Sequence, residues 1–288
     1  MSNIIEVKNL CYTYGGNAQV VRDAVHDVSF CVGEGEIVGI IGHTGSGKST
    51  LVQHLNGLLR PTSGEVFIDG VNIWDAPKKI RDVRFKVGLV FQYPEYQLFE
   101  ETVFEDISFG PKNMGLNGDE LTARVKEICE VVGIKEEYFY KSPFDLSGGE
   151  KRRVAIAGVM AMRPKVLILD EPIAGLDPRG RREVVQMVRR YREKYNATVM
   201  IISHNMEDMA LLADRLLVLN GGRLWTYDTV YNVFSRSGEL EKIGLTVPIV
   251  TKILQTIKEK NKDIRTDIFT VEEAVGYLCE IAAGGKNA

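Results

Sequence analysis

The segment GHTGSGKST at residues 42–50 constrains the fold of this 288-residue chain more than any other. Its glycines, lysine and serine have the spacing G-x4-G-K-[ST]. An apolar run, EIVGIIG at 36–42, precedes it, and STLVQHLNGLL at 49–59 follows with helical periodicity. A strand, a glycine-rich loop and a helix in this order are the context that a phosphate-binding loop requires. A glycine-rich turn without a ligand is the alternative, and both flanks argue against it.

Each part of this loop has a chemical role toward a bound nucleoside triphosphate. The glycines let the backbone curl so that several N–H groups point at phosphate oxygens, and the following helix presents its positive end to the same anion. Lys48 supplies a full charge toward the β- and γ-phosphates, and Ser49 supplies a hydroxyl group for Mg²⁺. We therefore expect the whole loop to bind ATP: Gly42, His43, Thr44, Gly45, Ser46, Gly47, Lys48, Ser49 and Thr50.

Two adjacent acids follow the apolar run VLIL in VLILDEP at 166–172. The pattern predicts a buried strand with Asp170 at its carboxyl end, where α/β sheets bind ligands. We expect Asp170 to hold Mg²⁺ and Glu171 to orient or deprotonate an attacking water. A pair of carboxylates that only solvates the strand end is the alternative.

The order of the remaining patterns predicts an α/β fold with a mainly parallel sheet. The first third of the chain has β-strand patterns, a helical insertion occupies about 93–164, and LLVLNGGRLWTY has the pattern of a hairpin. An amphipathic helix at 248–260 and a second helix, opened by a capping box of Thr270 and Glu273, complete the chain. We expect an ATPase domain at 1–235 and a helical extension at 236–288.

Composition excludes several other classes. The net charge of -3 offers no general attraction to nucleic acid or to anionic lipid. The cysteines Cys11, Cys31, Cys129 and Cys279 lack metal-ligand spacing, which is typical of thiols in a reducing compartment. No apolar run is long enough to span a bilayer. We expect a cytoplasmic protein that docks on an embedded partner if it works at a membrane.

A second anion-binding pattern lies a hundred residues after the first, in FDLSGGEKRRVAIAGVM at 144–160. Ser147 is a candidate N-cap, and Gly148 and Gly149 leave the first N–H groups of the following helix uncovered. The short run KRR at 151–153 is interpreted as a solvated face of that helix. A lone SGG is a weak signal, but a second phosphate site in one chain needs an explanation.

With this second pattern the chain resembles the ATP-binding cassette (ABC) family, over residues 4 to about 225. LSGGE at 146–150 is similar to the family's signature, and the other motifs occur in the family's order. They are Tyr14 in CYTYGG, Gln92 after a strand, Asp177 in AGLDP and His204 in IISHNMED.

The resemblance implies roles for these residues and explains the second site. Two cassettes face each other head to tail, so Ser147, Gly148, Gly149 and Asp177 would act in trans on ATP held by a partner. Tyr14 would stack on adenine, His204 would contact the γ-phosphate, and Gln92 would join Ser49 and Asp170 at Mg²⁺. The catalytic set would be Glu171, His204 and Gln92. Each residue also has a plainer interpretation: a structural histidine, a loop amide, a core tyrosine and a helix cap.

Two positions depart from the family pattern. Glu150 stands where the family usually has glutamine, and Ile173 where threonine is common. A carboxylate at Glu150 suits the first turn of a helix but could repel phosphates. We expect weaker ATP-driven closure and retained activity.

A narrower resemblance links the chain to the ATPase subunits of energy-coupling factor (ECF) transporters, especially the second, or A-prime, paralogue. It rests on FQYPEYQLFEETVFEDISFGPKNMG, LSGGEKRRVAIAGVMAM and the tail TVPIVTKIL…TVEEAVGYL. It implies import of vitamins, or of cobalt or nickel in related systems, at the cytoplasmic face of the membrane. The implied partners are a paralogous or identical ATPase, with a heterodimer favoured, a membrane scaffold and an exchangeable substrate-binding subunit.

Two surfaces are candidates for those partners. Aromatic residues alternate with acids after Gln92, and we expect Glu95 to Glu101 to border a groove for the scaffold's helices, with Phe104 and Phe109 in the core. The C-terminal helices would pack either on the partner ATPase or on this chain's own core.

Other classes remain as alternatives. A different ABC transporter is the nearest one. An ABC ATPase of DNA repair or translation would need a coiled coil, a second cassette or a basic stripe. A small-molecule kinase with a phosphate-binding loop gives no reason for LSGGE or His204.

Overall fold

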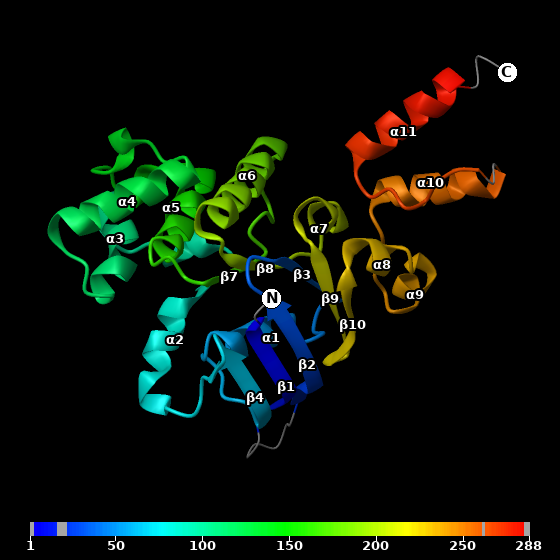
Figure 1. Ribbon diagram of the computed structural model, residues 1–288. Helices are drawn as coiled ribbons and strands as arrows, with labels where there is room; N and C mark the ends of the chain where they lie inside the picture. The colour runs from blue at the N-terminus through cyan, green and yellow to red at the C-terminus, as the bar shows by residue number, and fades with distance from the viewer. Residues whose placement is uncertain (1–2, 16–21, 261–262, 285–288) are drawn as a thin grey trace.

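The computed structural model describes residues 3–15, 22–260 and 263–284 and has the expected α/β architecture, with two sheets (Figure 1). The larger sheet has six strands in the order β10-β9-β3-β8-β7-β6. All neighbours in it are parallel except the hairpin pair β9 and β10. Its strands are β3 (Ile37–Ile41), β6 (Val87–Val90), β7 (Val166–Asp170), β8 (Thr198–Ile202), β9 (Arg215–Asn220) and β10 (Arg223–Thr229). The predicted mainly parallel sheet is confirmed.

The smaller sheet is antiparallel and formed by the N-terminal part of the chain. Its order is β2-β1-β4-β5, with β1 (Asn3–Tyr14), β2 (Arg22–Gly33), β4 (Ser63–Ile68) and β5 (Val71–Asn72). In Figure 1 β1, β2 and β4 form the blue and cyan layer on one side of the larger sheet.

Helices cover the opposite side of the larger sheet, and α1 (Lys48–Leu55) lies between the two sheets (Figure 1). The insertion between β6 and β7 holds α3 (Val103–Asn113), α4 (Gly118–Val132), α5 (Gly148–Met160) and the 3₁₀ turns η2 (Pro94–Gln97), η3 (Glu136–Tyr138) and η4 (Pro143–Asp145). Elsewhere the chain forms η1 (Pro77–Lys79), α2 (Ile80–Lys86), α6 (Pro178–Tyr195), α7 (Met206–Leu212), α8 (Val230–Phe234), α9 (Ser237–Lys242), α10 (Ile249–Lys260) and α11 (Val271–Gly284).

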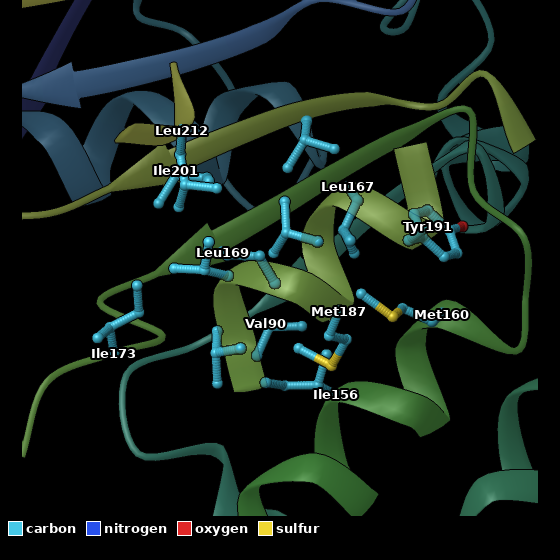
Figure 2. Close-up of a cluster of buried hydrophobic side chains, with 14 of the residues drawn as sticks. Val90, Ile156, Met160, Leu167, Leu169, Ile173, Met187, Tyr191, Ile201 and Leu212 are labelled. Atoms are coloured by element: carbon cyan, nitrogen blue, oxygen red, sulfur yellow. The ribbon is translucent and has the colours of Figure 1, made fainter. Parts of the chain in front are cut away.

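Successive residues of the buried strands face two different apolar cores. On β7, Val166 and Ile168 join the core shared with α1 and the smaller sheet. Leu167 and Leu169 join the core formed with α5 and α6, which Figure 2 shows in close-up. Both faces of a parallel sheet are covered in this way, so its strands are continuous apolar runs.

The C-terminal extension has a small core of its own, made of Val250, Leu254, Ile264, Ile268 and Ala274. The main core continues to Val247 and also takes in Phe269 of the extension, whose ring packs against that of Phe234. A hydrogen bond joins the two parts, because the first N–H of α10, at Ile249, donates to Glu207 Oε1 on α7 at 3.0 Å. The division at 235/236 stays a prediction, and its last residues, 285–288, lie outside the described part of the chain.

Candidate nucleotide site

The glycine-rich loop connects β3 to α1, as predicted, and its backbone leaves no room for side chains at two glycines. A Cβ atom on Gly42 would lie 2.4 Å from the carbonyl oxygen of Leu219, and one on Gly47 would lie 2.5 Å from that of Ala24. Gly47 also has a φ of +99°, in the region that favours glycine. The loop conformation therefore depends on glycine at both positions.

Lys48 lies inside the curl of this loop. Its Nζ donates to the carbonyl oxygens of Gly42 at 2.7 Å and His43 at 3.0 Å. Burial lowers the pKa of Lys48, while the carboxylates of Glu171 and Asp170 act in the opposite direction. The lysine thus places a positive charge next to the two acids that follow β7.

Ser49 and Asp170 meet across the sheet edge. Ser49 Oγ donates to Asp170 Oδ2 at 3.1 Å. Burial raises the pKa of Asp170, and the Ser49 bond and Lys48 partly offset this. A hydroxyl and a carboxylate are the hard oxygen donors that Mg²⁺ prefers, so this pair fits the metal.

Glu171 follows β7 in a strained backbone conformation, with a φ of +51°. Its N–H donates to the carbonyl oxygen of Ile202, and its own carbonyl accepts from Ala174 N–H. Burial, followed by the charge of Asp170, raises the pKa of Glu171 to about 7. Its buried Oε1 has no hydrogen-bond partner within the described residues, so it is free to accept a proton from a water.

His204 lies near this carboxylate, whereas Gln92 is placed only at the same edge of the sheet. His204 Nε2 is 3.4 Å from Glu171 Oε1. Burial and the charge of Lys48 lower the pKa of His204, so the imidazole is neutral at pH 7 and this contact is not an ion pair. Gln92 is exposed two residues after β6, whose pairing with β7 puts it at the same sheet edge as Asp170.

Tyr14 lies beside the loop, as its proposed role requires. Its hydroxyl is 3.2 Å from Thr50 Oγ1, and the two share a pocket of about 210 Å³ with Ala24, Gly45 and Lys48. Tyr14 is 40% exposed, so it is not the core residue that the plainer interpretation assumes.

The signature segment forms the predicted N-cap. Ser147 and Glu150 make a reciprocal capping box at the start of α5, in which Glu150 Oε2 accepts from both the N–H and the hydroxyl of Ser147. These bonds lower the pKa of Glu150. A Cβ on Gly148 or Gly149 would meet no atom within 4 Å, and neither glycine has a positive φ. Nothing within the described residues requires glycine at these two positions.

Asp177 lies across a hollow of about 470 Å³ from the signature segment. Its carboxylate accepts from Gly180 N–H at 2.7 Å, so it does cap α6, in agreement with the plainer interpretation. The hollow contains Ser147, Gly149 and Asp177 but no residue of the pocket at Tyr14 and Lys48. The two candidate anion sites of this chain therefore share no lining residue.

The segment after Gln92 differs from the expectation in two ways. The Glu95 carboxylate does not border a groove, because it turns inward and pairs with Arg152, whose side chain is only 6% exposed. Phe109, expected in the core, is 47% exposed, whereas Phe104 packs against the core as expected. A groove of about 530 Å³ does exist nearby, and its lining includes Phe99, Phe109, Arg81, Arg84 and Asp106.

Arg152 also shows what sequence reasoning missed. The run KRR at 151–153 was expected on a solvated face, yet Arg152 is buried and Arg153 Nη1 contacts Glu183. Charge alone gave no signal, because the partner Glu95 lies 57 residues earlier. An arginine within an apolar helix face is the one hint that the pattern contained.

A family model and full-length relatives both relate this chain to the ATP-binding proteins of ABC transporters. The sequence profile of the family described as ABC transporter matches residues 25–174. The energy-coupling factor transporter ATP-binding protein EcfA2 of Caldanaerobacter subterraneus subsp. tengcongensis is 50% identical over 98% of this chain and 99% of its own length. The EcfA2 protein of Clostridium perfringens is 51% identical over 96% and 98%.

Solved structures show the same likeness. The structure of cbiO1 from Clostridium perfringens, described as part of the ABC transporter complex cbiONQ, has a TM-score of 0.75 and 37% identity and covers 85% of this chain and 95% of its own. A dimeric post-hydrolysis structure of the ATP-binding cassette MJ0796, bound to ADP and Pi, has a TM-score of 0.70 and 28% identity, with 78% and 98% coverage. Within the described ranges, none of the helices combines the length and apolar character that crossing a bilayer requires.

Proposed function

Because the chain belongs to the ABC transporter family of ATP-binding proteins, we propose that it hydrolyses ATP as a subunit of an energy-coupling factor importer. The family implies ATPase activity in transport. The subtype is supported by relatives named for energy-coupling factor transporters, which are about half identical over nearly the whole chain. The cargo is a vitamin or a related micronutrient that enters through membrane subunits, so this subunit works at the cytoplasmic face of the membrane.

One observation carries the proposal. The signature helix begins with two glycines whose missing side chains leave open space on the surface, and the chain's own phosphate loop lies elsewhere. A helix N-terminus with uncovered N–H groups is suited to an anion. An ATP held by the phosphate loop of a second cassette supplies that anion, so each nucleotide is enclosed between two subunits.

Within one half of this composite site, the residues divide the binding of ATP among them. The loop at 42–50 and Lys48 hold the phosphates, and Tyr14 stacks on adenine. Ser49, Asp170 and Gln92 would hold Mg²⁺, which neutralises charge on the β- and γ-phosphates when it is bound. The 3.1 Å contact between Ser49 and Asp170 supports this donor set.

Glu171 is the group that activates water. It accepts a proton as the water oxygen bonds to the γ-phosphorus, and the bond from that phosphorus to the β–γ bridging oxygen breaks, which leaves ADP and phosphate. A pKa near 7 suits a general base at neutral pH, and the neutral His204 beside it can donate to a γ-phosphate oxygen. The Ser147–Gly149 segment and Asp177 contribute from the other cassette.

The test of this function is the dependence of hydrolysis on a second cassette. The full chain is assayed for ATP hydrolysis over a range of concentrations, and again in the complex that co-purifies with a tagged copy from membranes. We expect the rate per subunit to rise as the chain dimerises or joins the complex, and to collapse in Ser147→Ala/Gly148→Asp. A monomer that hydrolyses ATP at full rate, with both positions dispensable, would refute the proposal.

The groove at Phe99 and Phe109 is the proposed seat for the membrane scaffold. Two exposed aromatic rings in edge contact at 4.9 Å form its apolar wall, and Arg81 and Arg84 give it a basic rim. Reversing the charges at Glu100 and Glu101 tests the acidic side of the same segment. Unchanged assembly and transport would reject a role for these two acids.

The C-terminal helices are the proposed contact that keeps two ATPases paired when ATP leaves. They carry exposed apolar residues that no other part of the described chain covers. These are Ile249, Ile253, Val271, Val275, Leu278 and Ile281. The partner is a paralogue or a second copy, and a heterodimer is the favoured form. Identification of the proteins that co-purify from membranes separates the two.

A related dedicated transporter is the second candidate. The structural likeness to cbiO1, a part of the ABC transporter complex cbiONQ, favours it. In that case the tagged chain would recover one fixed set of membrane subunits. An energy-coupling factor system would instead yield several exchangeable substrate-binding subunits on one scaffold.

A further inference from the structure

Arg152 is the most completely bonded buried charge in the described part of the chain outside the nucleotide pocket. It lies on α5, one turn after the signature glycines, and is 5% exposed. Its Nε and Nη2 donate to both oxygens of Glu95, at 3.0 and 2.7 Å. A bidentate pair of this kind fixes direction as well as distance.

The remaining donor of the same guanidinium reaches the turn that follows Glu171. Arg152 Nη1 donates to the carbonyl oxygen of Ala174 at 2.6 Å and lies 3.4 Å from that of Pro172. The turn itself is closed by the bond from Ala174 N–H to the Glu171 carbonyl. Arg152 therefore binds the same short turn through two of its carbonyl oxygens.

Glu171 needs such support because its backbone is in the left-handed region, with a φ of +51°. A non-glycine residue keeps this conformation only where the surroundings hold it. The carbonyl oxygen of Ile202 accepts from the Glu171 N–H, and Ile173 packs into the apolar core. Arg152 binds the carbonyl oxygens of the next residues of the turn. The buried Ile173, drawn in Figure 2, also accounts for an apolar residue at this departure from the family pattern.

Glu95 connects this support to a surface. It belongs to η2, between Gln92 and the groove residues Leu98 and Phe99, and the Arg152 guanidinium also lies over the Tyr93 ring at 5.9 Å. A movement of the segment at 93–99 would therefore displace Glu95, and with it the Arg152 side chain that is bonded to the turn after Glu171.

We propose that Arg152 is a positioning residue for Glu171, and that Glu95 ties this positioning to the groove segment. This inference rests on the role proposed above for Glu171. Arg152 does not line the pocket at Tyr14 and Lys48; it acts by keeping the carboxylate where an attacking water can be deprotonated.

The test compares hydrolysis by the full-length chain, in the complex that co-purifies with it, for Arg152→Lys, Glu95→Gln and a matched control. Lysine keeps the charge but cannot reach the carboxylate and the two carbonyls together. We expect Arg152→Lys to lower kcat about tenfold and to leave KM for ATP within about twofold, because a small displacement of a catalytic group is costly. Glu95→Gln keeps one acceptor and is expected to lower kcat about threefold.

The control is Arg124→Gln. Arg124 is another arginine of the helical insertion; it is half-buried and donates to the carbonyl oxygen of Ala161 at 3.1 Å, and among the described residues no hydrogen bond joins it to the turn. Its kcat is expected to stay close to that of the unchanged chain. Thermal unfolding of each variant shows whether it is folded, and Glu95→Gln decides the question if Arg152→Lys does not fold.

A double variant separates this inference from a simpler effect on the signature. If Arg152 acts through Glu171, Arg152→Lys will not slow Glu171→Gln further, so the two effects will not add. An equal slowing in both backgrounds, or a kcat of Arg152→Lys within twofold of the unchanged chain, would overturn the inference. Near-normal hydrolysis by Glu171→Gln alone would instead overturn the proposed function.

Discussion

The replacement Gly148→Ala should make the chain more stable and less active, a combination that follows from the geometry at the start of α5. Gly148 is exposed, its φ is not in the left-handed region, and an added Cβ would meet nothing within 4 Å. Replacing such a glycine at a helical position reduces the freedom of the unfolded chain and stabilises the fold by up to about 1 kcal/mol. For a chain of this size that gain corresponds to a rise in Tm of roughly 2 °C.

Activity should move in the opposite direction. In the proposed dimer the space over Gly148 is filled by the phosphates of the partner's ATP, and a methyl group there separates them from the helix N-terminus. A loss of about 1.4 kcal/mol of transition-state binding would already lower the rate tenfold, and we expect at least that.

The assay pairs thermal unfolding with ATP hydrolysis for three glycine variants. Gly238→Ala is the matched control, because Gly238 is also helical with nothing within 4 Å of its Cβ, but it lies on α9. It should gain stability without losing activity. Gly47→Ala, with a φ of +99° and a contact of 2.5 Å, should lose both. Unimpaired hydrolysis by Gly148→Ala would refute the argument that an external phosphate approaches this helix.

Further predictions concern the carboxylate, the tyrosine and the C-terminal helices. Glu171→Gln should bind ATP but hydrolyse it at least about a hundredfold more slowly, since it cannot accept a proton; near-normal phosphate release would contradict the role. Because burial and Asp170 raise the pKa of Glu171 from 4.5 to about 7, the folded chain binds this proton more tightly than the unfolded chain. The resulting stability, about 3 kcal/mol, is complete below pH 4.5 and is lost as the pH rises through 7. The difference in unfolding free energy between the unchanged chain and Glu171→Gln should therefore fall from pH 5 to pH 8, and a constant difference would argue against it. Tyr14→Ala should raise KM for ATP about tenfold while Tyr14→Phe changes it little, as stacking requires; equal effects would favour the hydroxyl contact. Ile253→Glu/Val275→Glu should reduce the dimer seen by light scattering without ATP and leave the unfolding midpoint unchanged, whereas a lower midpoint would indicate a lid on the chain's own core.

Local patterns were enough to predict the elements on which the nucleotide site is built. The loop at 42–50, the acids after β7 and the helix at Ser147 each depend on neighbours within a few residues, so their spacing is visible in the sequence. The hairpin at NGG between β9 and β10 is likewise confirmed, with both glycines at positive φ.

Features that depend on distant partners could not be predicted in this way. Arg152 is buried only because Glu95 and two carbonyls surround it in three dimensions. Phe109 lies on a helix with apolar periodicity, but it is directed to the groove and contacts the ring of Phe99. The short helix α2 has no fully buried residue, although Ile80 and Val83 pack against the core shared with α1, and its seven residues are too few to give a clear helical period.

The alternation along β7 has a consequence for the two acids at its end. Val166 and Ile168 face the side on which α1 lies, and Asp170, next in the even series, reaches Ser49 on that helix. Glu171, one step later, points to His204 instead. Two adjacent acidic residues thus take different roles because one has an even and the other an odd position along the strand. Exchanging them as Asp170→Glu/Glu171→Asp would conserve composition and charge and still misassign both tasks, and deleting one residue upstream in the strand would reverse the parity altogether.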